Sequence, residues 1–265
     1  MWLLMKNLIL VCCFFLFSVA LHAKETITIV RGNGNYFPLE YLENDKLTGI
    51  HIDLIQAVAD ELGLTVKFES LPWSRALLYF KLGKYDAMSH VSHTEERATF
   101  AHFLAGNITS SVKTYPIVLS RRKNEIAFDG NLTSLIGYKI AVGKDYRYGQ
   151  PLDTASFLSK YEIPSPSQAV LTKLLNLERV DVIIGSRRNL LQVHSEHEIN
   201  ELYHVFKQPV ASDNSYLVFS KVRNSLAIAE KFAVGINNYR SGQAYQLLLQ
   251  NYKNREHSQN TQAKQ

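Results

Sequence analysis

Cysteine is nearly absent from this 265-residue sequence, and both cysteines, Cys12 and Cys13, lie close to the amino terminus. They fall within a mostly apolar run at residues 8–21, which follows the single basic residue Lys6. A short basic end, an apolar core and small residues before a polar segment are typical of a secretory signal peptide. We therefore expect residues 1–23 to be cleaved, which leaves a mature chain without disulfides, thiolate metal ligands or a cysteine nucleophile.

Long apolar runs and clusters of like charge are lacking after residue 23. No further stretch approaches the roughly 20 apolar residues of a membrane-spanning helix, although an uncleaved first segment would act as an anchor. The formal charge of +5 becomes +4 without Lys6, and lysine and arginine do not cluster as they do in nucleic-acid-binding proteins. An exported chain without disulfides fits the bacterial periplasm. We expect a soluble, monomeric periplasmic protein with no nucleic-acid partner.

The first half of the mature chain alternates between strand and helix patterns. β-Branched residues at 26–32 predict a buried strand, and residues 50–63 predict an amphipathic helix, because apolar residues recur there every three or four positions. The order strand, helix, strand continues at residues 64–71, 74–85 and 86–91. This alternation favours a largely parallel sheet with helices on its faces.

A second α/β set begins near residue 112, so the fold class is α/β with two units of similar size. Its first strand contains Pro116, which places that strand at an edge or makes it a connector. Strands are then predicted at residues 138–143, 180–186, 202–210 and 215–221, and helices at residues 150–161, 167–178, 188–198 and 225–252. Residues 256–265 contain no large apolar residue and are expected to be disordered. A cleft between two such units is a preferred place for a small ligand.

Residues 89–100, SHVSHTEERATF, combine two histidines, two glutamates, hydroxyl groups and one arginine. His90 and His93 stand three residues apart, which can bind a metal on a helix, but this segment is predicted to be a strand followed by a loop. Zinc sites also need a third and a fourth ligand, and the neighbouring sequence does not supply them unambiguously. We therefore predict no metal site and no cofactor.

Arg97 is the better candidate within this segment. A guanidinium presents paired planar donors that match a carboxylate, and burial in a cleft strengthens such a pair. Hydroxyl groups nearby add neutral donors, and they belong to Ser89, Ser92 and Thr94. The alternative for Arg97 is a surface ion pair with Glu95 or Glu96.

Residues 35–100, from NYFPLEYLENDKLTG to TEERATF, resemble the N-terminal lobe of the bacterial periplasmic solute-binding proteins of family 3, the polar-amino-acid-type binding components of ABC importers. The resemblance is strong over residues 26–120 and continues more weakly through residues 177–190 and the C-terminal helices. It implies a type II, Venus-flytrap fold, in which two lobes are joined by two crossing strands. Lobe 1 would comprise residues 24–113 and 211–255, and lobe 2 residues 114–210.

The same resemblance implies a set of ligand-binding residues in lobe 1. Arg97 matches the arginine that grips the ligand α-carboxylate, and Ser92 matches a position that donates to the same group. Tyr36 matches an aromatic residue of the first loop that packs on the ligand, with Phe37 beside it. His90 stands where a small hydroxyl residue often lines the cleft.

Two further positions in lobe 1 are left open by the residues alone. Trp73 either packs at the junction of a sheet and a helix or approaches the rim of the cleft. Arg75 either is a solvated residue of a first helical turn or adds a second cation at that rim.

Lobe 2 departs from the family pattern. Family members usually carry an acidic residue for the ligand ammonium where this chain has Ser186 and Arg187, and the segment KDYRYG at residues 144–149 replaces a glycine–threonine turn. Asp145 could substitute as the ammonium partner. An α-amino acid, a dicarboxylate and another anionic metabolite all stay open as ligands.

Three functions compete. The leading interpretation is a non-enzymatic protein that binds a small carboxylate-bearing solute, such as an amino acid or related metabolite, for an ABC permease in the inner membrane. The second is a periplasmic dehydratase-like enzyme on the same fold, for which Glu40, Glu69 and the His90 region are the candidate acids. The third is a ligand-sensing module for a membrane receptor.

Overall fold

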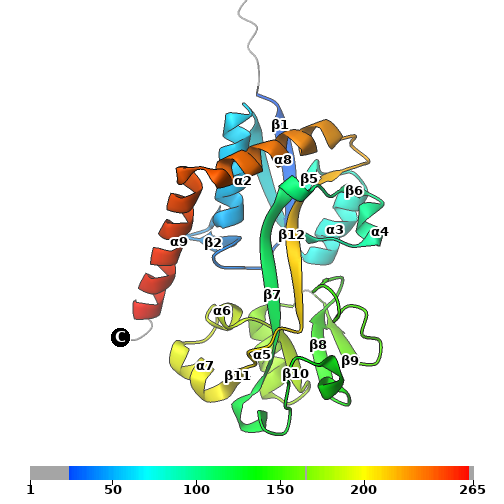
Figure 1. Cartoon of the computed structure of the whole chain (residues 1–265), viewed down its shortest axis with the longest axis vertical. Coiled ribbons are helices and arrows are strands. Elements are labelled where there is room, and N and C mark those ends of the chain that lie inside the picture. Colours follow the sequence, from blue (N-terminus) through cyan, green and yellow to red (C-terminus); the bar gives the residue numbers. More distant parts are fainter. Residues whose placement is uncertain (1–23, 165, 263–265) are drawn as a thin grey trace, which may run out of the picture.

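In a computed structural model, the chain forms two α/β lobes joined by two long strands, β7 (Ile108–Leu119) and β12 (Ala211–Ser220) (Figure 1). The structure describes residues 24–164 and 166–262. The expected signal segment, residues 1–23, lies outside these ranges. Among the described residues, no helix combines the length and the apolar character needed to cross a membrane.

Lobe 1 is built around a parallel sheet from the first third of the chain. Its elements are β1 (Thr26–Gly32), β2 (Tyr41–Glu43), β3 (Lys46–Thr48), α2 (Ile50–Glu61), β4 (Thr65–Leu71), α3 (Trp73–Lys81), β5 (Ala87–Ser92), α4 (Glu95–Ala98), β6 (Ala101–His102), the 3-10 turn η1 (Ala105–Asn107), α8 (Leu226–Ser241) and α9 (Gln243–Gln262). Strand β1 lies between β4 and β5, and β12 runs antiparallel beside β5. Helices α2 and α8 cover one face of this sheet, and α3 covers the other.

Strand β1 shows why both faces of this sheet are covered. Ile29 and Val30 are fully buried neighbours, and successive side chains of a strand point to opposite faces. Ile29 packs with Leu54 of α2 and Phe232 of α8, whereas Val30 packs with Phe80 of α3. The alternating strands and helices predicted for the first half of the chain are confirmed.

Lobe 2 has a smaller sheet with parallel strands and one antiparallel neighbour. Its elements are the 3-10 turns η2 (Ser120–Arg122) and η3 (Leu132–Leu135), β8 (Lys139–Gly143), β9 (Ser159–Ile163), α5 (Gln168–Asn176), β10 (Val182–Gly185), α6 (Arg187–Leu190), α7 (Glu196–Leu202) and β11 (Tyr203–Val205). Strand β8 pairs in parallel with β9 and β10, and β7 pairs antiparallel with β10. The three helices pack on one face, while the other face is covered by irregular segments near residues 126–135 and 152–158.

Strand β7 belongs to both lobes. Its residues 108–114 pair with β12, whereas residues 115–119 pair with β10 and β11. Pro116 therefore lies between two strands and not at an edge, and its carbonyl accepts the backbone N–H of Phe206 at 3.1 Å. Of the two roles considered for this strand, the connector is the one observed. The expected lobe limits fall inside β7, between residues 113 and 114, and at the start of β12.

The helix predicted over residues 150–161 is wrong. Leu152, Ala155 and Leu158 are buried at three-residue spacing, which imitates a helical stripe, but they reach the core from a series of turns that leads into β9. The carboxylate of Asp153 accepts the backbone N–H of Tyr148, which fixes these turns.

Two further differences concern helix ends. The helix predicted over residues 188–198 is divided into α6 and α7, because Ser195 starts a new helix with a capping box that includes Glu198. Helix α9 continues to Gln262, into the segment for which disorder was expected.

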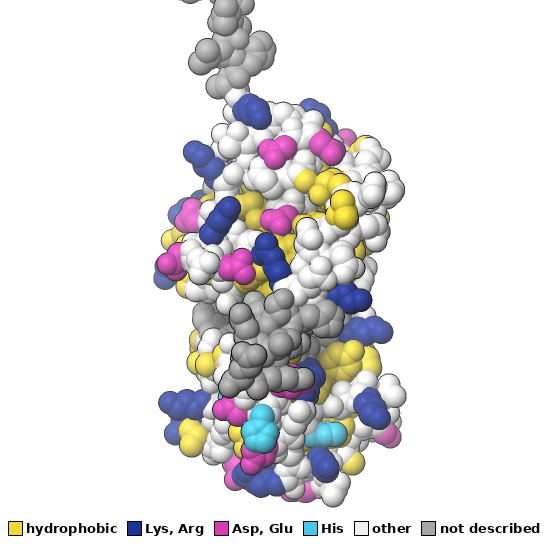
Figure 2. Space-filling model, turned by 90° about the vertical axis from the view of Figure 1, so that its left-hand side faces the viewer, with side chains coloured by type: hydrophobic (Ala, Val, Ile, Leu, Met, Phe, Trp, Pro, Cys, Tyr) yellow, Lys and Arg dark blue, Asp and Glu magenta, His cyan; other side chains and the backbone are white. Residues whose placement is uncertain are grey.

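Charged side chains of both signs are interspersed over the two lobes on the face shown in Figure 2. Apolar side chains occur there in small groups between them. Such a mixture is ordinary for the surface of a globular protein. It agrees with a chain whose net charge is only mildly basic.

The core of lobe 1 should depend on Phe232, which is fully buried and packs on Phe219 with ring centroids 5.3 Å apart. Phe232→Ala should lower the free energy of unfolding by about 3–5 kcal/mol, because it leaves a cavity between α8 and the sheet. Val234 on the same helix is 61% exposed, and Val234→Ala should change it by about 0.5 kcal/mol or less. Urea denaturation measures the free energy of unfolding of both variants, and an equal decrease in the two would contradict this packing.

Candidate functional site

Arg97 lies where the two lobes meet, on the four-residue helix α4. The Oγ1 of Thr94 caps this helix by accepting the Arg97 backbone N–H at 3.1 Å. The guanidinium is buried, and the residue is only 4% exposed. It donates from Nη1 to the Ser92 carbonyl at 2.9 Å and from Nη2 to the Asp145 carbonyl of lobe 2 at 2.8 Å. Burial, with Arg147 nearby, lowers the pKa of Arg97 to about 10, so the side chain stays cationic at neutral pH.

Arg97 is not part of a surface ion pair, which was the alternative for it. Glu95 and Glu96 are exposed, and Glu96 lies 3.8 Å from the amino group of Lys81. The acceptors of the Arg97 side chain in the described part of the chain are backbone carbonyls. A buried guanidinium held only by neutral acceptors is suited to accept an anion.

Trp73 completes the arginine site from the first turn of α3. Its Nε1–H donates to the same Asp145 carbonyl at 2.9 Å, and the Arg97 guanidinium lies 5.4 Å from the centroid of its ring. The Asp145 backbone has φ 62°, a left-handed conformation that turns this carbonyl toward lobe 1. Trp73, Ser92 and Arg97 are called the clamp below.

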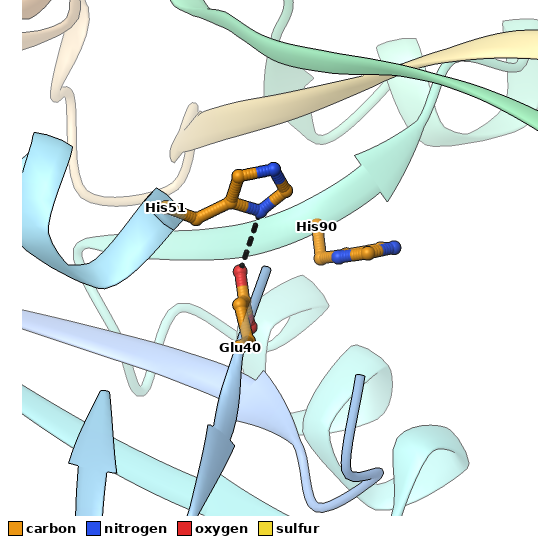
Figure 3. A group of neighbouring side chains, drawn as sticks. All are labelled: Glu40, His51 and His90. Atoms are coloured by element: carbon orange, nitrogen blue, oxygen red, sulfur yellow. Dashed lines mark hydrogen bonds and ion pairs between the residues drawn. The ribbon is translucent and has the colours of Figure 1, made fainter. Parts of the chain in front are cut away.

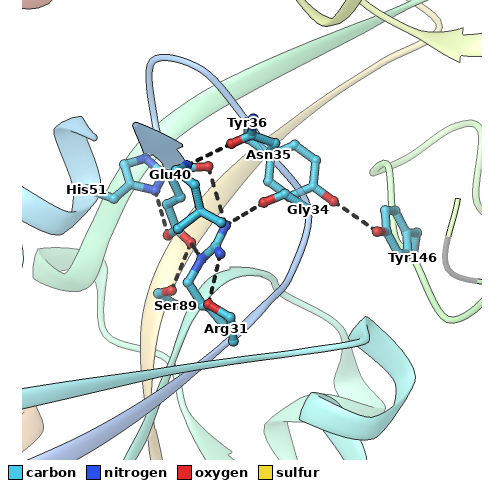
Figure 4. Close-up of polar contacts among 10 residues, drawn as sticks. Arg31, Gly34, Asn35, Tyr36, Glu40, His51, Ser89 and Tyr146 are labelled. Atoms are coloured by element: carbon cyan, nitrogen blue, oxygen red, sulfur yellow. Dashed lines mark hydrogen bonds and ion pairs between the residues drawn. The ribbon is translucent and has the colours of Figure 1, made fainter. Parts of the chain in front are cut away.

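A loop of lobe 2, residues 144–148, lies against the clamp. Ser92 Oγ donates to the Arg147 carbonyl at 3.3 Å. The ring of Tyr146 meets Trp73 edge to face, with centroids 5.5 Å apart, and its hydroxyl lies 2.8 Å from that of Tyr36 (Figure 4). We call residues 144–148 the cleft loop, because they place lobe 2 directly on the residues expected to bind a ligand.

Beneath Tyr36 lies a buried polar group that we call the buried cluster: Arg31, Glu40, His51, Ser89 and His90. Glu40 Oε2 accepts hydrogen bonds from Arg31 Nε at 2.9 Å and from Ser89 Oγ at 3.1 Å, and Oε1 lies 3.2 Å from His51 Nδ1 (Figure 4). Burial raises the pKa of Glu40, but the His51 hydrogen bond and the neighbouring His90, His51 and Arg31 outweigh it and hold that pKa well below its ordinary value. Glu40 is therefore ionised and serves as the counter-charge of Arg31.

His90 connects the buried cluster to the cleft through a bulge in β5. Between Met88 and Val91 the register with β12 shifts, and His90 has φ 59°. Bulges of this kind redirect a side chain. The His90 ring stacks on Tyr36 with centroids 5.2 Å apart, and its Nδ1 is buried without a hydrogen-bond partner among the described residues. Burial lowers the pKa of His90 to about 4, so the ring is neutral at pH 7.

Glu40, His51 and His90 form the one group in the described part of the chain whose ligand atoms have a spacing that could hold a metal ion, all within 4.8 Å of one another (Figure 3). The neighbouring charges disfavour this use. Arg31 already neutralises Glu40, so a divalent ion would add a charge of +2 without a counter-charge to a buried site. We interpret the group as an ion-pair network, and we keep the prediction that the protein has no metal site.

The other residues predicted for the site lie at its margin or elsewhere. Phe37 packs edge to face on Tyr41. Ser186 caps α6 and donates to Asn189 Oδ1 at 2.6 Å. The carboxylate of Asp145, the proposed ammonium partner, accepts from Ser74 Oγ at 2.5 Å.

Three further charged or aromatic candidates of the sequence analysis are exposed. Arg75 is exposed, as a solvated residue of a first helical turn would be. His93 is exposed and packs on Phe103, apart from the histidine pair of the buried cluster. Glu69 is also exposed.

Sequence reasoning missed Arg31, His51 and Tyr146. A signal for Arg31 was present, because a charged residue inside the apolar strand TITIVRG must find a buried partner. No comparable signal marks His51, which occupies a buried position of an ordinary amphipathic helix. Tyr146 belongs to the segment that was noted as unusual, but its contact with Tyr36 spans the two lobes and cannot be inferred from spacing.

A pocket of about 480 Å³ lies in lobe 2, between residues 130–132 and residues 151–157. Its lining has no ionisable side chain and shares no residue with the clamp. The chemistry of a charged ligand therefore favours the clamp over this pocket.

The ion pair within the buried cluster should support the fold. Glu40→Gln should lower the free energy of unfolding by about 3 kcal/mol at pH 7, because Arg31 loses its counter-charge. The folded pKa of Glu40 lies below its ordinary value of 4.5, so this stability is complete above pH 4.5 and is lost as pH falls through the folded pKa. In urea denaturation, the difference in free energy of unfolding between wild type and variant should be smaller by about 1 kcal/mol at pH 4 than at pH 7.

The matched control for Glu40→Gln is Glu43→Gln, which removes an exposed partner of Arg255 and should cost about 0.5 kcal/mol or less. Equal costs for the two substitutions would contradict a supporting role for the buried cluster.

His90 should make the protein less stable on the acid side. Its pKa is about 4 when folded against an ordinary 6.5, so the unfolded chain binds more protons between these values. Its stabilising effect is complete above pH 6.5 and is lost as pH falls toward 4. His90→Gln should lose less stability than wild type between pH 7 and pH 4.5 in urea denaturation, while His93→Gln follows wild type. Parallel curves for wild type and His90→Gln would refute this.

The sequence of residues 28–254 matches the bacterial extracellular solute-binding proteins, family 3. The chain is similar to the probable amino-acid-binding protein YxeM of Bacillus subtilis (strain 168), with 24% identity over 169 residues that cover 63% of this chain and 62% of that protein. It is also similar to the probable histidine-binding protein of Campylobacter jejuni, with 22% identity over 239 residues and 87% of each chain.

Solved structures share the fold at low sequence identity. A histidine kinase sensor domain with similarity to periplasmic binding proteins has a TM-score of 0.69 at 20% identity, over 86% of this chain and 96% of that one. An ancestral arginine-binding protein bound to arginine has a TM-score of 0.68 at 20% identity, over 87% of this chain and 99% of that one. Both the sequence match and the architecture of two lobes joined by β7 and β12 lead to one assignment. The chain belongs to the bacterial extracellular solute-binding proteins, family 3, and has the type II, Venus-flytrap periplasmic-binding-protein fold that its sequence predicted.

Proposed function

We propose that this protein binds a small carboxylate-bearing solute, an amino acid or a related metabolite, at the clamp between its two lobes. The observation that carries this proposal is the buried guanidinium of Arg97, whose side-chain acceptors are carbonyl oxygens. A carboxylate oxygen in place of the Asp145 carbonyl would receive hydrogen bonds from Arg97 and Trp73 and would also supply the missing negative charge. Charge-assisted hydrogen bonds of this kind are roughly twice as strong as neutral ones.

The relatives support an amino acid or a similar molecule as the solute. Two of them are named as probable amino-acid-binding and histidine-binding proteins, and the ancestral arginine-binding protein among the structural neighbours holds arginine. In lobe 2, however, the Asp145 carboxylate is engaged by Ser74 and Ser186 by Asn189. We therefore do not expect the ligand to need an ammonium group, and carboxylates without one belong in the same screen.

We expect binding without turnover. A dehydratase would need a protonated acid at the cleft, but Glu40 is ionised and held by Arg31 and Ser89, and His90 is neutral at pH 7. Glu69 is exposed on the outer strand β4.

Delivery to an ABC permease in the inner membrane, from a periplasmic location, follows the usual role of this family's relatives and completes the proposal. A sensing role is the second candidate, since a histidine kinase sensor domain is among the structural neighbours. Co-purification with a permease or with a membrane receptor would decide between these two partners.

Arg97→Ala should weaken ligand binding strongly. Loss of one partner from a buried charge pair typically costs 2–5 kcal/mol, so affinity should fall about 30-fold or more. Calorimetry with carboxylates that raise the thermal midpoint of the wild type measures this, and the exposed Arg75→Ala serves as the control. The proposal is refuted if no amino acid or small carboxylate stabilises the wild type, or if Arg97→Ala keeps wild-type affinity while remaining folded.

A further inference from the structure

The cleft loop presents lobe 1 with the two chemical groups that a ligand would bring. The Asp145 carbonyl occupies the donors of the clamp, Trp73 Nε1 at 2.9 Å and Arg97 Nη2 at 2.8 Å. The adjoining Tyr146 places an aromatic ring against Trp73 and a hydroxyl 2.8 Å from the Tyr36 hydroxyl. One dipeptide unit therefore fills the positions of both an acid group and a side chain.

The cleft loop is held in this shape by contacts within lobe 2. Gly143 N–H donates to the Tyr148 hydroxyl at 2.8 Å, and the Asp153 carboxylate accepts the N–H of Tyr148 and of Gly149. The Tyr146 ring lies directly over Gly143, where an added Cβ would come within 2.6 Å of the Tyr146 Cγ. A larger residue at position 143 would push the ring away. These contacts within lobe 2 fix the loop in a shape that presents Tyr146 to lobe 1.

We propose that the Asp145–Tyr146 segment is an internal surrogate ligand, and that the solute which displaces it is a carboxylate carrying an aromatic ring. This inference rests on the proposed function, because it uses the same clamp. The solute carboxylate takes the place of the Asp145 carbonyl at Arg97 and Trp73. Its ring takes the place of the Tyr146 ring against Trp73, within reach of the Tyr36 hydroxyl (Figure 4).

The covalent structure of the segment sets the size of the preferred solute. The Asp145 carbonyl carbon and the Tyr146 ring are separated by three atoms, the amide nitrogen, Cα and Cβ of Tyr146. A 4-(4-hydroxyphenyl)butanoate anion has the same three-atom spacer, and L-tyrosine has a spacer one atom shorter. The aromatic ring of Trp73, which contacts the Tyr146 ring edge to face, favours a flat ring over an aliphatic chain. Arginine and leucine lack such a ring and are the contrasting probes.

An internal competitor has a predictable effect on affinity. The apparent dissociation constant equals the intrinsic one divided by the fraction of molecules whose clamp is free. Removal of the Tyr146 side chain takes away its edge-to-face contact with Trp73 and its hydroxyl contact with Tyr36, while the clamp itself is unchanged. The free fraction should rise, and binding of the external solute should tighten.

The test is isothermal titration of the whole protein with 4-(4-hydroxyphenyl)butanoate, L-tyrosine, L-arginine and L-leucine. Wild type is compared with Tyr146→Ala, with the milder Tyr146→Phe, and with Tyr161→Ala, a tyrosine of β9 that is 45% exposed. We expect the two aryl carboxylates to bind at least ten times more tightly than leucine or arginine. Tyr146→Ala should tighten their binding about tenfold, Tyr146→Phe by about two- to threefold, and Tyr161→Ala should have no effect.

Each outcome separates this inference from the proposed function. Unchanged or weaker binding in a folded Tyr146→Ala would overturn it and identify Tyr146 as part of the ligand's own site or as a bystander. Arginine or leucine binding that depends on Arg97 but not on Tyr146 would keep the proposed function and refute the surrogate. If no carboxylate binds either wild type or Tyr146→Ala, both proposals fail.

Discussion

A buried guanidinium without a carboxylate partner is the constraint on which the arrangement of the two lobes depends. Arg97 lies under the lobe boundary and stays charged at neutral pH, and an isolated buried charge is costly unless polar groups surround it. Its own lobe supplies one carbonyl, from Ser92, and the second must come from across the cleft. The Arg97 side chain therefore links the lobes through a hydrogen bond to an acceptor on the far side of the cleft. That acceptor is the Asp145 carbonyl in this structure, and under our proposal it would be the ligand carboxylate in a complex.

The buried cluster beneath the cleft solves the opposite problem. There, Arg31 has a counter-charge in Glu40, and Ser89 and His51 also contact that carboxylate. This ion-paired network holds the first loop and Tyr36 in place without offering a charge to a ligand. Lobe 1 buries two arginines, and the difference in their partners underlies our proposal that Arg31 supports the structure and Arg97 binds the ligand.

Much of this architecture follows from the sequence, and the parts that do not have a common cause. The regular alternation in lobe 1 is set by local apolar periods, so its strands and helices could be predicted, whereas the expectation for Arg97 came from the resemblance to the family. The false helix at residues 150–161 arose because turns bury Leu152, Ala155 and Leu158 at a helical spacing. The contact of Tyr36 with Tyr146 joins residues that are 110 positions apart in the sequence. No local sequence pattern predicts such a contact.

The most direct test of the account uses Trp73, the one tryptophan of the sequence after residue 23. Its indole N–H donates to the Asp145 carbonyl, which a bound carboxylate would replace, and its ring contacts both Arg97 and Tyr146. Tryptophan fluorescence should therefore change and saturate as a binding carboxylate is added, with the midpoint that calorimetry gives for the same molecule. A solute that binds by calorimetry and leaves the emission of Trp73 unchanged would contradict the clamp as the binding site.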